Sequence, residues 1–298
     1  MWLTHALLMC LFCGWIVLAL WGWFSSSKSK QPYAKVNASW TIAINSAVLY
    51  ALAFNIIFFI QELFLALGKY WLGLRAVLYH NNHNWFDDHP KDALAQGYGA
   101  FAIFITGILL SILFFAMKPG RSWLRLFIFW MAYQGLIQSL PQFATAVMDR
   151  DTDTGQAFTY LGWSETTGYV LFVVCTVLTV MISLVGSKIL LSMAPSGEYL
   201  QHPKQKFGYA FKIALMAGVI GLALIFPFRI PPLDRAMAPM MLTLISVPWI
   251  FANAWRVKKV VPHGNTANDK VLMLPILLLA ILLLIFQWVL RPGVEFNP

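Results

Sequence analysis

The sequence predicts an all-α integral membrane protein, a polytopic helical bundle of about eight transmembrane helices. Two features of composition support this prediction: 59% of the 298 residues are hydrophobic and only 11% are charged. Soluble domains carry about a quarter charged residues, so a water-soluble globule is excluded. The third feature is length, because the apolar runs extend over about 20 residues, whereas strands of an outer-membrane barrel need only about ten and alternate in polarity.

The predicted spans follow one another along the chain, each bounded by a polar or cationic stretch. A helix of about 20 residues rises about 30 Å and so crosses the hydrocarbon core. No intervening loop is long enough to form a soluble domain, so we expect a single transmembrane domain over 1–298. The spans are 3–23, 38–65, 95–117, 123–147, 168–193, 208–228, 236–255 and 271–290.

Cations are concentrated in the loops that follow the odd-numbered spans. These loops and their flanking turns hold 14 of the 21 Lys and Arg residues, among them Lys30, Arg121, Lys204 and Lys259. The positive-inside rule then puts these loops in the cytoplasm and both termini outside it. In a soluble protein the same excess would suggest a nucleic-acid partner. In this apolar chain the excess of cations instead sets the orientation in the membrane. The predicted partner is the lipid bilayer of a bacterial inner or plasma membrane, and no nucleic acid is expected.

Several polar side chains fall inside the predicted spans, where polar groups are rare. Glu62 is ionisable, and Asn55 lies two turns before it on the same helical face. The glutamines of the fourth span recur every four residues and form one stripe, and we expect their amides to donate hydrogen bonds to the Glu62 carboxylate. Two interpretations stay open: hydrogen bonds between helices, or a polar chamber for a substrate or ion. The residues are Asn55, Gln61, Glu62, Gln134, Gln138 and Gln142.

Histidines and carboxylates gather in the predicted loop after the second span, and more aspartates lie in the loop after the fourth. Imidazole and carboxylate together suit zinc, copper or iron, so a single divalent metal is one interpretation of these loops. The other is a polar interfacial loop anchored by Trp85 and Phe86 at the level of the lipid headgroups. The candidate ligands are His80, His83, Asp87, His89 and Asp153.

Three short motifs occur in a fixed order. They are Gln61-Glu62-Leu63-Phe64-Leu65, then Gln96-Gly97-Tyr98-Gly99, and finally Asp153-Thr154-Gly155. Their order and spacing resemble those of the site-2-protease-like (M50-type) membrane metalloproteases, in which an HExxH helix precedes a glycine-rich helix and a loop with an aspartate before glycine. The resemblance implies a protease-like core over 55–191, with additional helices in 1–37 and 205–298.

The same resemblance bears on chemistry. In the family motif two histidines one turn apart hold zinc, and the glutamate between them activates water. The corresponding histidine positions here are Gln61 and Leu65, and only Glu62 keeps the family residue. The resemblance therefore implies a catalytically inactive relative.

Three functions are consistent with these observations. The first is a non-catalytic accessory or scaffold subunit of a membrane assembly, together with other membrane protein subunits. The second is a metal-dependent membrane enzyme of hydrolase type, with Glu62 as acid or base and His80, His83 and His89 as metal ligands. The third is a transporter or channel whose polar chamber is lined by Asn55, Glu62, Gln134 and Gln138.

Overall fold

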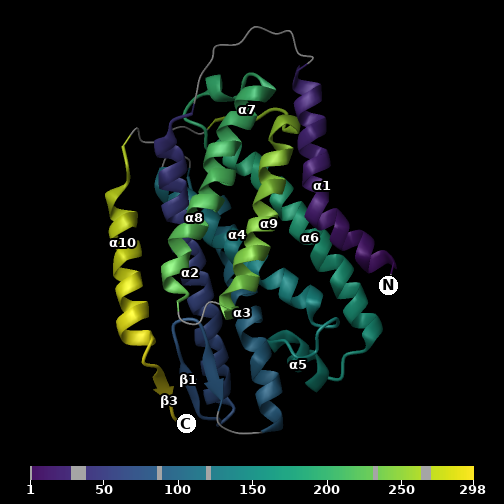
Figure 1. Cartoon of the computed structure of the whole chain (residues 1–298), viewed down its shortest axis with the longest axis vertical. Coiled ribbons are helices and arrows are strands. Elements are labelled where there is room, and N and C mark those ends of the chain that lie inside the picture. The colour runs from purple at the N-terminus through teal and green to yellow at the C-terminus, as the bar shows by residue number, and fades with distance from the viewer. Residues whose placement is uncertain (1, 28–37, 86–88, 119–121, 231–233, 263–269) are drawn as a thin grey trace.

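The computed structural model describes residues 2–27, 38–85, 89–118, 122–230, 234–262 and 270–298. The all-α prediction is confirmed, because helices make up most of the described chain (Figure 1). Six helical segments are long and apolar enough to cross a membrane, which supports an integral membrane protein. These segments are α1 (Trp2–Ser27), α2 (Trp40–Trp71), α3 (Pro90–Ala116), α6 (Glu165–Ser192), the run from α7 (Pro203–Ala210) through α8 (Ala217–Ile225) to Phe228, and α10 (Met273–Leu284) with its extension to Leu290.

Two further helices form where spans were predicted but are not among the six. They are α4 (Ser122–Thr145) and α9 (Asp234–Asn253). The α4 helix carries the glutamine stripe, which lowers its mean hydropathy, and it packs against α2, α3 and α6. Helices surrounded by other helices tolerate polar side chains that a lipid-facing helix would not. The structure thus supports six spans directly.

The α2 helix is the centre of the bundle. Most of its side chains are buried, whereas α1 and α10 at opposite edges of Figure 1 expose most of theirs. It contacts α3, α4, α8 and α10. A helix that is apolar all round and surrounded by helices is typical of a membrane-bundle core. The polar residues that α2 does carry are therefore held away from lipid.

Glycine allows α3 and α4 to cross closely. A Cβ atom at Gly135 would lie 2.8 Å from the Cα of Gly107, so neither position has room for a side chain. Small residues at such crossings let membrane helices pack through their backbones. This contact fixes α4 against α3 and, with α6 on the other side of α4, sets the spacing of the three helices.

A small sheet, which the sequence did not predict, covers one end of α2. Strand β1 (Ala76–Leu78) pairs antiparallel with β2 (His83–Trp85) and with β3 (Val294–Phe296). The sheet and the short helix α5 (Asp153–Tyr160) lie at one end of the molecule, and α7 lies at the other (Figure 1). The β1–β2 hairpin is what carries His83 back over α2.

Helix starts near the sheet are set by local capping. His89 accepts a hydrogen bond from the Lys91 amide at the start of α3, and Pro90 occupies the first helical position, where its missing N–H costs nothing. Thr152 caps α5 in the same way by accepting from the Gly155 amide. These caps fix where Asp92 and Asp153 begin their helices.

Candidate functional site

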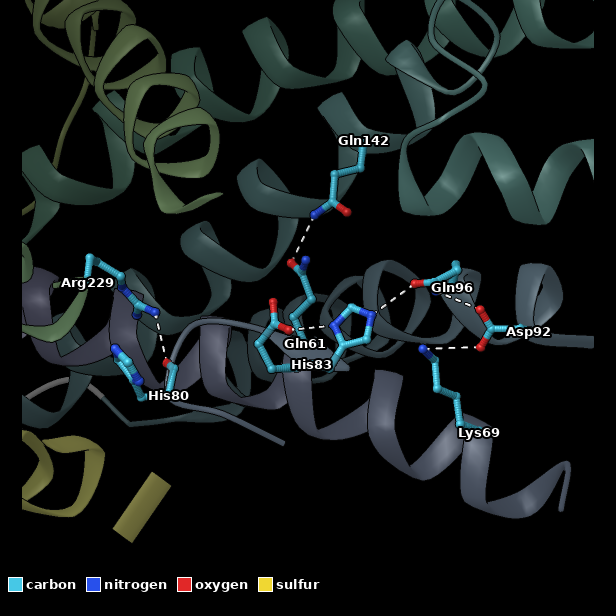
Figure 2. A network of polar contacts seen from close by, with 9 residues as sticks. Gln61, Lys69, His80, His83, Asp92, Gln96, Gln142 and Arg229 are labelled. Atoms are coloured by element: carbon cyan, nitrogen blue, oxygen red, sulfur yellow. Dashed lines mark hydrogen bonds and ion pairs between the residues drawn. The ribbon is translucent and has the colours of Figure 1, made fainter. Parts of the chain in front are cut away.

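A chain of buried polar side chains runs between α2, β2 and α3 (Figure 2). Its first link is the pair Glu62 and His83, with Oε2 and Nδ1 separated by 2.9 Å and both side chains less than a tenth exposed. His83 then reaches α3, where its Nε2 lies 3.1 Å from Oε1 of Gln96. Residues 62 and 83 are 21 positions apart, and the end of α2 and strand β1 lie between them.

This series of polar side chains ends in an ion pair between Asp92 and Lys69. The Gln96 amide nitrogen donates to Oδ2 of Asp92 at 3.3 Å, and Oδ1 of Asp92 lies 3.1 Å from the Lys69 ammonium. Lys69 is fully buried and Asp92 nearly so. Glu62 and Lys69 are two turns apart on α2, and Asp92 and Gln96 one turn apart on α3, so one face of each helix supplies two residues and β2 supplies His83. We call Glu62, His83, Gln96, Asp92 and Lys69 the carboxylate–imidazole chain.

Both ring nitrogens of His83 have a side-chain partner. The NH2 group of Gln96 donates to Asp92, so its carbonyl oxygen faces Nε2 of His83. Glu62 presents a second oxygen on the other side of the ring, facing Nδ1. Oxygen atoms of the protein thus occupy both nitrogens of the ring.

The glutamines of α4 do not reach Glu62, and the expectation that they do is wrong. The Gln138 amide donates to Oε1 of Gln134 at 3.0 Å, and Gln142 donates to Oε1 of Gln61 at 2.9 Å (Figure 2). The stripe therefore bonds along α4 and meets α2 one residue before Glu62. His83, and not an amide, is the partner of the carboxylate, because the hairpin brings it closer than α4 comes.

A second buried polar cluster surrounds Arg229. Its Nη2 donates to Oδ1 of Asn55 at 2.6 Å, and its Nη1 to the His80 carbonyl at 3.3 Å. The Asn81 amide donates back to the Arg229 carbonyl at 3.1 Å. Aromatic rings enclose the fully buried guanidinium, with its Cζ 3.9 Å from the centroid of Phe58. We call these residues, together with Phe54 and Phe286, the arginine cluster.

Asn55 shares a buried helix with Glu62, as predicted, but its partner is Arg229. Arg229, Lys69 and Asp92 were not predicted from the sequence as site residues, and Gln96 was predicted only as part of a motif. Each cation lies at the edge of an apolar run and so looks like a loop residue. A signal was present in the mismatch between Glu62 and its apolar surroundings, since a buried charge requires a partner.

The candidate metal ligands are not brought together. His83 is taken up by Glu62 and Gln96, His89 caps α3, and the His80 carbonyl accepts from Arg229. Asp153 begins α5 and interacts electrostatically with Lys69. Within the described residues no group of three or more His, Cys, Asp or Glu side chains could hold a metal ion. Asp87 lies outside the described residues.

Comparisons of the chain with protein families, with curated proteins and with solved structures return no match.

Proposed function

We propose that this protein is a non-catalytic relative of the site-2-protease-like membrane metalloproteases and serves as an accessory or scaffold subunit of a membrane assembly. In this proposal the carboxylate–imidazole chain replaces the metal as the element that holds α2 and α3 together. Glu62, the one residue of the HExxH motif that is retained, has a structural role.

The placement of the His83 ring is the observation that carries the proposal. A metal ligand must offer a free imidazole lone pair. Both His83 nitrogens instead point at oxygen atoms of other side chains, Glu62 on one side and Gln96 on the other. Releasing His83 to a metal would leave the buried Glu62 side chain without this hydrogen-bond partner, which is costly.

The packing around α2 also supports a degenerate protease-like core. Gln142 of α4 links the Gln61 amide to Thr154, whose hydroxyl donates to the Gln142 carbonyl at 2.8 Å. The first and third motifs thus lie on either side of one α4 residue. Leu65 is fully buried, and a Cβ at Gly99 of the second motif would lie 2.6 Å from it. The second ligand position of the motif is thereby part of an apolar helix contact.

Restoring the two histidines tests this proposal. We expect the purified full chain to bind no stoichiometric zinc, and the variant with Gln61→His and Leu65→His to bind about one zinc ion per chain. Adding Asp153→Asn should lower that zinc content, whereas Asp151→Asn, on the exposed part of the same loop, should not. Gln61→His alone is the companion variant, because Leu65 is tightly packed; it should bind zinc more weakly.

Two results would overturn the proposal. Stoichiometric zinc, copper or iron in the unmodified chain, lost in His83→Ala and reduced in His89→Ala, would support the metal-dependent enzyme instead. A correctly folded double variant that binds no zinc would contradict the proposed protease-like core. The accessory role is checked separately by native electrophoresis of solubilised source membranes, where the chain should migrate well above its mass of 33.7 kDa.

We also infer that α4 and α9 span the membrane, giving eight spans, and that both termini lie outside the cytoplasm of a bacterial inner or plasma membrane. The distribution of cations supports this arrangement. Reporters fused after Lys204 or Lys259 should register as cytoplasmic, and a reporter fused after His89 as external. A cytoplasmic signal from the His89 fusion would reverse the orientation.

A proton-coupled transporter is the second candidate. It is favoured by the contact between Gln142 and Gln61, which connects the polar stripe of α4 to the residue beside Glu62. In proteoliposomes with an imposed pH gradient, a transporter should dissipate the gradient, and Glu62→Gln should stop it because an amide cannot exchange the proton. No dissipation by a folded chain would exclude this candidate.

A further inference from the structure

A lateral groove of about 290 Å³ opens between α3 and α6, with α4 as its floor. Phe114 and Phe115 of α3, Phe129 of α4, and Val185 and Ile189 of α6 line it. Phe115 and Val185 are more than half exposed, so the groove opens sideways, toward the lipid in a membrane. It is separate from the carboxylate–imidazole chain, none of whose residues line it.

The lining of the groove is hydrocarbon apart from two hydroxyl groups. Ser111 and Tyr133 contribute the two hydroxyl groups of its lining, and both are already engaged. The Ser111 hydroxyl donates to the Gly107 carbonyl at 2.8 Å, and the Tyr133 hydroxyl lies 2.9 Å from that of Ser183. An occupant of the groove therefore meets apolar surface and needs no hydrogen-bonding groups of its own there.

Three cations lie toward one end of the groove, one on or next to each of the three helices. Arg125, in the first turns of α4, has its Cζ 4.7 Å from the centroid of the Phe114 ring, and its Nε is buried with no hydrogen-bond partner among the described residues. Lys118 follows the end of α3, and Lys188 precedes Ile189 near the end of α6; both are exposed. Three helices thus each bring one cation to the same end.

The length of the groove matches one leaflet. Its lining on α6 runs from Leu178 to Ile189, about 16 Å of helix at about 1.5 Å per residue. The hydrocarbon core is about 30 Å thick, so this length is close to half of it. The cations stand at the end where α6 finishes, and the loops on that side are the cation-rich ones.

We propose that this groove binds one acyl chain of an anionic phospholipid, whose phosphate is held by Arg125 with Lys118 and Lys188. Guanidinium groups recognise phosphate by charge-assisted hydrogen bonds, and basic sites between membrane helices attract anionic headgroups. The proposal does not depend on the proposed function, because it concerns a separate surface.

Lipid binding to the full chain in a mild detergent tests this proposal, with bound lipids counted by native mass spectrometry. Phosphatidylglycerol and phosphatidylcholine with identical acyl chains are the probes. We expect one preferred phosphatidylglycerol, and Arg125→Gln should weaken its binding about five-fold while leaving phosphatidylcholine unchanged. Arg125→Lys should retain part of the preference. Arg75→Gln, at the opposite end of the chain's fold and exposed, is the matched control.

A second variant tests the groove itself. A Cβ at Gly186 would contact Phe129 at 3.4 Å and Ile250 at 3.5 Å, which are ordinary distances, so Gly186→Ala should fold while narrowing the groove and weakening both lipids. Gly208→Ala, where a Cβ meets nothing within 4 Å, is its control. Equal binding of the two lipids by the unmodified chain would overturn the proposal. So would competition by inorganic phosphate alone, or a dimer that Gly186→Ala dissociates, since the occupant would then be a second copy.

Discussion

The carboxylate–imidazole chain and the arginine cluster are both buried around α2, yet they compensate charge in opposite ways. In the first, titratable side chains are paired with one another, Lys69 with Asp92 and Glu62 with His83, and Gln96 connects the two pairs. In the second, the Arg229 guanidinium is held by an amide oxygen, a carbonyl and aromatic faces. A buried charge can thus be stabilised by a counter-ion or by oriented dipoles and rings. The two solutions should respond differently to substitution.

The largest effect is expected at the buried end of the carboxylate–imidazole chain. Lys69→Met leaves the Asp92 carboxylate without its cation, and removing one partner of a buried pair costs roughly 3–5 kcal/mol. The free energy of unfolding is measured by denaturation in mixed micelles, followed by tryptophan fluorescence. Lys91→Met, an exposed lysine next to Asp92, should change it by less than about 0.5 kcal/mol. Equal effects of the two variants would show that Asp92 does not depend on Lys69.

A smaller effect is expected in the arginine cluster from a substitution that keeps the charge. Arg229→Lys cannot donate to Asn55 and the His80 carbonyl together while lying flat on Phe58, so we expect a loss of about 2 kcal/mol. Arg256→Lys is the control, because Arg256 lies 5.8 Å from the Trp21 centroid but is exposed. If Arg229→Lys were as harmless as Arg256→Lys, positive charge alone, and not the planar guanidinium, would hold the cluster.

Glu62→Gln should cost less again, about 1 kcal/mol, because the amide oxygen can still accept from His83. Glu62→Leu should cost more than Glu62→Gln, since it leaves Nδ1 of the buried His83 ring without its hydrogen-bond partner. The same mixed-micelle denaturation compares the two. Normal folding of Glu62→Gln with loss of a cellular phenotype would contradict a structural role for Glu62.

The sequence predicted the helices well and the site in part, for physical reasons. Apolar runs leave a chain in a membrane little choice but helix, so even the more polar α4 and α9 form where expected. Glu62 stood out because carboxylates are rare in such runs. Its partner did not, because a hairpin of three-residue strands brings His83 back over α2. The local sequence pattern does not indicate that this hairpin places His83 beside Glu62.

Contacts between distant segments could not be predicted for the same reason. Arg229 reaches Asn55 across 174 residues of chain, and each residue alone has an ordinary explanation, as a loop cation and a helix amide. The zinc, copper or iron site was inferred from histidines that lie close in sequence. In the fold, His83 faces Glu62 and Gln96 while His89 caps α3. His83 and His89 are therefore close in sequence but do not share a coordination sphere.

The smallest effect is expected at the sheet, where an exposed ion pair contrasts with both buried clusters. Arg75 donates to Glu295 of β3 at 2.9 Å, and both side chains are about half exposed. This hydrogen bond, the positive charge of Arg75 and a hydrogen bond from Asn297 lower the pKa of Glu295 below its ordinary value. Exposed pairs contribute little and are screened by salt.

The sign of the pH dependence follows from that lowered pKa. A carboxylate whose pKa is lower in the folded state stabilises that state above the unfolded pKa, about 4.3. The contribution disappears as the pH falls through the folded pKa. Hydrogen exchange of the β3 amides should therefore show slightly more protection in the unmodified chain than in Glu295→Gln at pH 7, and the difference should vanish once the pH has fallen below the folded pKa, with the two proteins compared at each pH. A difference that persisted at acid pH would mean that the Glu295 side chain stabilises β3 by packing and not by its charge.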